Sequence, residues 1–213
     1  MVHVKWHGHS CFEFSEGATV LVDPHDGASL GFPVPDARPD IVLISHGHDD
    51  HANGKHLFEG SSVLVLDEPC ELEHKGVKIR GVKTYHDAVE GSRLGPNVVF
   101  VFEIDGVSFA HLGDLGHALD RSHLEEMGRV DVLITGIGRG SQLSEENIMK
   151  VDPRVVIPMH YHVEGIIFPY FKMMKVTEFT KGRSHVRWLE GSESDYEFGS
   201  LPEERETHVF RLW

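Results

Sequence analysis

The sequence predicts a mixed α/β protein with two β-sheets and helices on their outer faces. Short β-rich runs dominate the first two thirds of the chain, and strands alternate with helices further on. Asp105-Gly106 joins two of the apolar runs, and this dipeptide is a strong signal for a two-residue hairpin turn. Hairpins followed by strand–helix alternation favour two packed sheets. No long linker, low-complexity tract or repeat is visible, so we expect a single domain over residues 1–213.

Runs of branched and aromatic residues, bounded by turn residues, define the predicted strands. In chain order these are Val2–Trp6, Cys11–Phe14, Thr19–Val22, Ile41–Ile44, Val63–Leu66, Val77–Val82, Val98–Ile104, Val107–Ala110, Val130–Thr135 and Val155–Pro158. Helices are predicted for fewer segments. They are Asn53–Phe58, Asp120–Met127, a segment that opens at Ser144 and stops before Pro153, and Phe168–Lys175. Asp120 begins its segment and Gly128 follows it, which is the pattern of a capped helix.

The bulk composition is that of a soluble globular protein, with 40% hydrophobic and 25% charged residues. No apolar run is long enough to span a bilayer and no signal-peptide pattern is present, so we expect a cytoplasmic protein without a membrane partner. The net charge of −14 repels phosphate backbones and argues against a nucleic-acid partner. Cys11 and Cys70 are the only cysteines, so no disulfide framework is expected.

The most informative stretch is His46-Gly47-His48-Asp49-Asp50-His51, directly after the apolar run Ile41–Ile44. Imidazole and carboxylate groups are the ligands that borderline and hard divalent metals prefer. Residues two apart on an extended segment point to the same side, so His46 and His48 are expected to face one point beyond the strand end. The following turn can direct Asp50 and His51 toward a neighbouring point. One short loop therefore predicts two adjacent half-sites for metals.

Further candidate ligands lie just past other predicted strands. His86 follows the run Val77–Val82, Asp114 follows Val107–Ala110, and His160 follows Val155–Pro158. Strand ends are where functional residues gather on sheet scaffolds. His160-Tyr161-His162 leaves two imidazoles as candidates for the last ligand, and we favour His160 because it ends the strand.

These motifs resemble those of the metallo-β-lactamase superfamily. Its HxHxDH signature matches residues 46–51, and His86, Leu112-Gly113-Asp114 and Pro158-Met159-His160 follow in the expected order. Gly8-His9-Ser10 and Val22-Asp23-Pro24 resemble the lactonase-like branch, which contains the ascorbate-6-phosphate lactonases and many metal-dependent hydrolases. The resemblance runs from about Val4 to Tyr161. It implies a four-layer αββα sandwich with metals at one edge of the two sheets.

The resemblance also implies a ligand set. One metal takes His46, His48 and His86, a second takes Asp50, His51 and His160, and Asp114 bridges both. We expect two divalent ions, zinc first and Mn, Fe or Ni as alternatives, because nitrogen-rich sites accept all of them. Two such ions favour hydrolysis by a metal-bridging hydroxide, with Asp50 as a catalytic residue. The predicted substrate is a small-molecule ester, lactone, amide or phosphoester.

Four residues are candidates for supporting the metals or contacting substrate. Asp23 ends a predicted strand and can partner the second ring nitrogen of a ligating imidazole. His9 and His111 are expected near the site. Arg139, in the glycine-rich turn 136–140, is a candidate contact for an anionic substrate.

Two other functions remain open from the sequence. A metal-dependent nuclease or phosphodiesterase uses the same ligands, although the acidic charge and the lack of basic clusters weigh against it. A non-catalytic, metal-binding regulatory domain would retain the fold. A homo-oligomer is compatible with either function.

Overall fold

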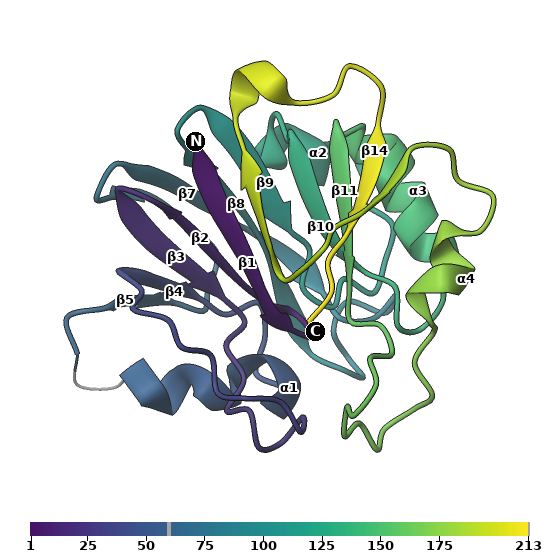
Figure 1. Cartoon of the computed structure of the whole chain (residues 1–213). Coiled ribbons are helices and arrows are strands. Elements are labelled where there is room, and N and C mark those ends of the chain that lie inside the picture. Colours follow the sequence, from purple (N-terminus) through teal and green to yellow (C-terminus); the bar gives the residue numbers. More distant parts are fainter. Residues whose placement is uncertain (59–60, 213) are drawn as a thin grey trace.

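A computed structural model gives the structure of the protein and describes residues 1–58 and 61–212. Over these residues the chain forms two mixed β-sheets that pack face to face (Figure 1). The first sheet has six strands, in the order β13 (Glu193–Tyr196), β1 (Val2–Gly8), β2 (Cys11–Glu16), β3 (Ala18–Val22), β4 (Ile41–Leu43) and β5 (Leu64–Leu66). In the same described ranges the second sheet has eight, in the order β12 (Val186–Trp188), β14 (Glu206–Val209), β11 (Val155–Met159), β10 (Val132–Gly136), β9 (Val107–His111), β8 (Pro96–Ile104), β7 (Val77–Tyr85) and β6 (Cys70–His74).

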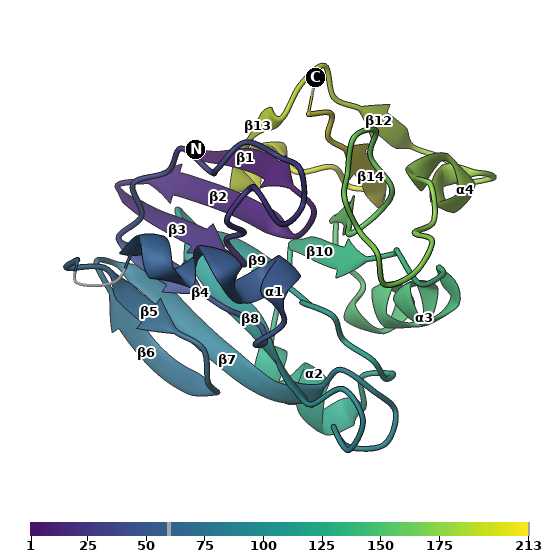
Figure 2. The same cartoon turned by 90° about the horizontal axis from the view of Figure 1, so that it is seen from below.

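Helices cover the outer faces of both sheets, which gives the predicted αββα arrangement (Figure 2). Helix α1 (Asp49–Ala52) and the 3₁₀ helix η1 (Asn53–Phe58) pack on the first sheet, where Ala52 and Phe58 contact Val42 and Ile44. Three helices lie against the second sheet and contribute Met127, Ile148 and Phe179 to the main core. They are α2 (Arg121–Met127), α3 (Gln142–Val151) and α4 (Val176–Thr180), and a short 3₁₀ helix η2 (Phe198–Ser200) follows β13.

The main core lies between the two sheets, and strand periodicity fills it. In β1, Val2, Val4 and Trp6 are buried while the residues between them are partly exposed, as expected for a strand with one face in the core. Phe14 of the first sheet contacts Phe102 and Phe109 of the second, each at a ring-centroid distance of 4.9 Å. Burial of one such side chain contributes about 1.5–3 kcal/mol. Aromatic packing therefore fixes the distance between the sheets.

Strand direction determines where the site forms. Strands β1, β2 and β3 are antiparallel, as are β6 to β9, whereas β3, β4 and β5 and the set β9, β10, β11 and β14 are parallel. The carboxyl ends of β4, β9, β10 and β11 therefore meet at one edge of the molecule. A backbone hydrogen bond of 2.7 Å from Val98 N–H to Ser45 O joins the two sheets at this edge.

Each predicted strand is present in the structure, with its ends at most three residues from the predicted ones. Strands β6, β12, β13 and β14 were not predicted, because they are short and, except in β14, their side chains are mostly half-buried or exposed. The predicted helix Phe168–Lys175 is wrong: this segment is irregular, and the helix begins only at Val176. Pro169 lacks a backbone N–H, and the apolar side chains here face a cavity instead of a sheet. Among the described residues, no helix has the length and apolar character needed to cross a membrane.

Candidate metal centre

The structure brings the seven predicted ligands together at the edge where the parallel strands end. Helix α1 begins within the His46–His51 motif and lies at the lower edge of the view in Figure 1. His86 follows β7, Asp114 follows β9 and His160 follows β11. Most of these side chains are buried, and among the predicted histidine ligands His48 is the most exposed. The convergence of so many titratable groups is costly unless a cation balances them.

Three imidazoles form the first half of the cluster. One ring nitrogen from each of His46, His48 and His86 lies within 4.8 Å of the others, a spacing that a single ion can bridge. His46 Nε2 lies 3.1 Å from His48 Nδ1. His86 is 3% exposed, and its ring centroid is 4.9 Å from those of both other histidines.

The second half contains Asp50, His51 and His160, with His9 beside them. Asp50 Oδ2 is the centre of this group. It lies 2.9 Å from His9 Nε2, 3.3 Å from His160 Nε2 and 3.4 Å from His51 Nε2. His9 was predicted only as a neighbour of the site, and the structure places its ring 3.9 Å from that of His160, centroid to centroid.

Asp114 lies between the two halves. Its Oδ2 is 3.1 Å from His86 Nε2, whereas its Oδ1 is 3.4 Å from His51 Nε2 and 3.5 Å from His160 Nε2. Each carboxylate oxygen therefore faces a different group of histidines. A carboxylate placed in this way can contact both groups at once.

The buried ring nitrogens show that the donor set fits metal ions. Both nitrogens of His86 and of His160, and Nδ1 of His9, are buried without a properly directed hydrogen bond to any described residue. Buried polar groups are normally hydrogen-bonded, and each exception requires an explanation. Carboxylate oxygens of Asp50 and Asp114 lie 3.1–3.5 Å from these nitrogens, close enough for the carboxylates and imidazoles to share an ion. Imidazole nitrogens and carboxylate oxygens are suitable ligands for zinc and related divalent ions.

Asp23 and Ser45 orient two of these histidines. Asp23 is fully buried and its Oδ2 accepts hydrogen bonds of 2.7 Å from both His51 Nδ1 and Ser45 Oγ. Ser45 Oγ in turn lies 3.0 Å from His46 Nδ1 and accepts its proton. Both rings therefore carry a proton on Nδ1 and turn Nε2 toward the cluster. The sequence analysis included Asp23 as a candidate but missed Ser45, whose position before the motif was the available signal.

The backbone around the site adopts uncommon conformations. His9, Asp23 and His160 have positive φ values of 53°, 47° and 55°, a region that non-glycine residues rarely adopt. Two glycines permit close approach of the loops. A Cβ on Gly113 would lie 2.5 Å from Ser45 Cβ, and one on Gly138 would lie 2.2 Å from His160 O. Strain concentrated at these positions is consistent with a functional site.

The remaining candidates have separate places. His111 is buried behind the cluster, where its Nε2 donates to Ser10 O at 2.9 Å and its Nδ1 accepts from Gly113 N–H. It therefore supports the loop that carries Asp114. Arg139 is exposed at the rim of the cluster. His162 is exposed and belongs to neither half of the cluster among the described residues, whereas His160 belongs to the second half.

The pKa values divide the histidines into two kinds. Burial lowers the pKa of His9 and of His46 to about 3, so both rings stay neutral. Burial also opposes protonation of His51, but the carboxylates of Asp114, Asp23 and Asp50 outweigh this effect and raise its pKa well above the usual value. Neutral imidazoles are ready to coordinate, whereas His51 must release a proton before it can bind a metal.

Two adjoining cavities open from the cluster. One of about 810 Å³ extends toward the amino-terminal end of α3, and one of about 1060 Å³ extends toward the segment 168–174. His86, Asp114 and Arg139 line both. Volumes of this size accommodate a small organic molecule next to the metal-binding groups.

Comparison with known proteins gives the family. The family model described as the beta-lactamase superfamily domain matches residues 3–160. The chain belongs to this superfamily. Its relatives include a UPF0173 metal-dependent hydrolase of Thermoplasma acidophilum, 25% identical over 191 residues, which cover 77% of this chain and 85% of the relative. A UPF0173 metal-dependent hydrolase of Thermococcus onnurineus is 29% identical over 194 residues, with 76% and 85% covered.

Solved structures agree with the superfamily assignment. A Thermotoga maritima protein described as a Zn-dependent hydrolase of the metallo-beta-lactamase superfamily has a TM-score of 0.80 and 33% identity, with 100% of both chains covered. Igni18, a metallo hydrolase from Ignicoccus hospitalis, is 19% identical with a TM-score of 0.60, covers 76% of this chain and 83% of its own, and shares the fold. Together these comparisons identify this protein as a metal-dependent hydrolase of the superfamily.

Proposed function

We propose that this superfamily member is a binuclear metal hydrolase that acts on a small-molecule ester, lactone, amide or phosphoester. His46, His48 and His86 would hold one divalent ion, and Asp50, His51 and His160 a second. Asp114 would contact both. The observation that carries this proposal is the division of the Asp114 carboxylate, with Oδ2 at 3.1 Å from His86 and Oδ1 at 3.4 Å from His51. Zinc is the proposed ion, with Mn, Fe or Ni as alternatives for the same ligands.

When bound, a pair of divalent ions supplies a water of lowered pKa and polarises the oxygen atoms of the reacting group. The protein's own residues would position the reaction. Asp50 lines the larger cavity, so its carboxylate would orient the attacking water. His9 Nε2, at 2.9 Å, would fix the Asp50 carboxylate in place. Asp23 would keep His46 and His51 in the tautomer that presents Nε2 to the site.

A small molecule is the proposed substrate, and a nucleic acid is not. The net charge of −14 gives a phosphate backbone an unfavourable field. The two cavities, of about 810 and 1060 Å³, match the size of a compact ligand. Lactones are included among the candidates because the Gly8-His9-Ser10 motif resembles the lactonase-like branch.

A substrate panel tests this proposal. Protein purified without added metal is assayed on activated esters, lactones, amides and phosphodiesters before chelation, after chelation, and after single metals are restored. The proposal predicts hydrolysis of at least one small-molecule class, lost with the metal and regained with it. Titration of labelled RNA and single-stranded DNA provides the competing outcome. Salt-sensitive binding at micromolar concentration, with cleavage and no small-molecule hydrolysis, would favour the nuclease function instead.

A further inference from the structure

The larger cavity next to the metal centre has one wall that is rich in aromatic and apolar side chains. Its wall on one side is the irregular segment that the sequence analysis had predicted as a helix. Phe168, Tyr170, Phe171, Met173 and Met174 of this segment line the cavity, together with Lys172 among them and Glu178 beyond them. Apolar and aromatic side chains in such numbers favour an apolar ligand group. The opposite side is formed by the metal-binding turn and includes Asp50.

The aromatic residues of the wall lie directly against the proposed metal ligands. Phe171 stacks on His160, with ring planes 3° apart and centroids 6.0 Å apart. Phe168 contacts the same imidazole edge-on at 5.3 Å and lies 5.4 Å from His9. Tyr170 packs on Phe168 yet remains 67% exposed. An apolar group held by this wall would therefore be next to the reacting centre.

Backbone hydrogen bonds hold the wall in position. Met174 N–H donates to Gly138 O at 3.0 Å, and Met174 O accepts from His162 N–H at 2.9 Å. Ile167 N–H donates to Leu30 O at 2.9 Å. The wall is thereby attached at both ends, to the loop that carries Arg139 and to the first half of the chain. A fixed wall offers a preformed surface, which reduces the entropy lost on binding.

Arg139 provides a free positive charge at the edge of this wall. Its guanidinium carbon lies 4.9 Å from the Phe171 ring centroid, and it makes no hydrogen bond or ion pair with a described residue. By contrast, Arg129 and Arg183 pair with Asp131 and Glu145. The cation–π contact orients the guanidinium, so its N–H donors remain available for a planar anion. In a chain of net charge −14, an unpaired arginine beside the reacting centre points to recognition of negative charge.

We propose that the enzyme binds an aryl or bulky alkyl anion, with the apolar group on Phe168 and Phe171 and the anionic group on Arg139. This substrate class rests on the proposed hydrolase function. The bond to be cleaved would lie over the metal centre, between the two contacts. Neutral or short-chain substrates would lack one of the two interactions and bind more weakly.

Direct binding of three probes, two sulfonates and one alcohol, tests the proposal without any turnover. Phenylpropanesulfonate carries both groups, propanesulfonate only the anion and phenylpropanol only the ring. Sulfonates are weakly basic and compete poorly for a metal, so their binding reports on the protein. Isothermal titration calorimetry of the metal-loaded protein is expected to give at least about tenfold tighter binding of phenylpropanesulfonate than of either fragment.

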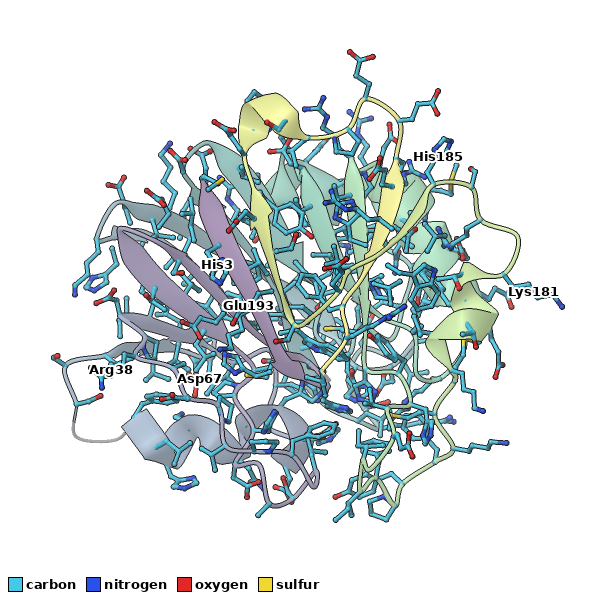
Figure 3. The ribbon with its side chains drawn as sticks, in the orientation of Figure 1. His3, Arg38, Asp67, Lys181, His185 and Glu193 are labelled. Atoms are coloured by element: carbon cyan, nitrogen blue, oxygen red, sulfur yellow. The ribbon has the colours of Figure 1, made fainter. Side chains whose placement is uncertain are left out.

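Two variants and a control separate the contacts. Arg139→Ala is expected to weaken phenylpropanesulfonate about tenfold or more and to leave phenylpropanol unchanged, since a charge-assisted hydrogen bond is lost. Phe171→Leu is expected to weaken both ring-bearing probes several-fold and propanesulfonate by less, because that probe loses only the orientation that Phe171 gives to Arg139. Lys181→Ala is the control. Figure 3 shows Lys181 at the outer surface beyond α4. Lys181 is not among the described residues that line the two cavities.

Equal affinity of the native protein for all three probes would overturn the proposal, as would an equal loss of phenylpropanol and phenylpropanesulfonate in Arg139→Ala. Circular dichroism of Phe171→Leu confirms that the variant is folded. If that variant does not fold, the Arg139 series alone decides. Failure of the hydrolase function is recognised separately, because the substrate panel would show no metal-dependent turnover while these affinities could still follow the predicted order.

Discussion

Asp23 offers the sharpest test of how the metal centre is held together. The carboxylate is fully buried and receives three hydrogen bonds of 2.7 Å, from Ser45 N–H, Ser45 Oγ and His51 Nδ1. Asp23→Asn retains the shape but replaces one oxygen with an NH₂ group. That group would face the Ser45 hydroxyl and the His51 Nδ1–H, both of which are donors. The tautomers of His51 and His46 would no longer be fixed.

The expected magnitudes follow from these contacts. Loss of a residue that orients a ligating imidazole typically lowers metal affinity about 10–100-fold. This corresponds to about 1.4–2.7 kcal/mol. Two hydrogen bonds to a charged acceptor are also lost, at about 1.5 kcal/mol each, so the free energy of unfolding of the metal-free protein should fall by about 3 kcal/mol.

The assay pairs two measurements. Metal affinity is measured by competition with a chromophoric chelator, and stability by urea unfolding of the metal-free protein. Asp131→Asn is the matched control, because Asp131 is also buried, accepts from Ser108 N–H at 2.9 Å, and lies just before β10 at the opposite edge. It should lower stability without changing metal affinity. Metal affinity of Asp23→Asn within twofold of the native value would show that Asp23 does not orient the ligating imidazoles.

Three further predictions concern Asp50, the histidines and Asp87. Asp50→Asn should lower turnover at least about 100-fold in a folded protein, and near-native kcat on any substrate that the panel finds would remove Asp50 from the mechanism. The metal-free protein should lose stability as the pH falls from about 6.5 toward 3, because His9 and His46 have folded-state pKa values of about 3 while the unfolded imidazoles take up protons. His51 has a raised pKa, so its contribution to stability should fall as the pH rises above about 6.5. A melting temperature that stays constant from about pH 3 to above pH 6.5 would contradict the pKa shifts of all three histidines. Burial opposes ionisation of Asp87, but four backbone N–H groups outweigh it and lower its pKa to about 2, so its contribution should be lost only as the pH falls from about 4 through 2. Asp87→Ala should speed hydrogen exchange across the loop 87–95 at neutral pH, and unchanged exchange there would show that these bonds do not order the loop.

The fold and the ligand cluster were largely predictable because their signals are local. An apolar strand followed by HxHxDH fixes both a strand end and a ligand pair, and β1 shows its buried face through simple alternation of Val2, Val4 and Trp6. The later ligands His86, Asp114 and His160 could be found because each follows a strand.

The unpredicted features depend on contacts between distant segments. Ser45 gains its role only because Asp23 lies beside it, a pairing 22 positions apart in the sequence. The apolar residues after Phe168 were assigned to a helix because a short apolar run does not reveal what it packs against. They line a cavity whose other wall is the metal-binding turn. The C-terminal strands β12 to β14 depend on pairing with β1 and β11, so local propensity gave little sign of them.

Occupancy of the cluster by two ions can be measured through the metal content of three proteins. Elemental analysis under saturating metal is made on the native protein and on His86→Ala and His160→Ala, one from each half of the site. We predict two ions per chain in the native protein. Each variant should lose affinity at one position and keep the other, with a different position affected in each. A native protein that never binds more than one ion per chain would exclude a two-ion site.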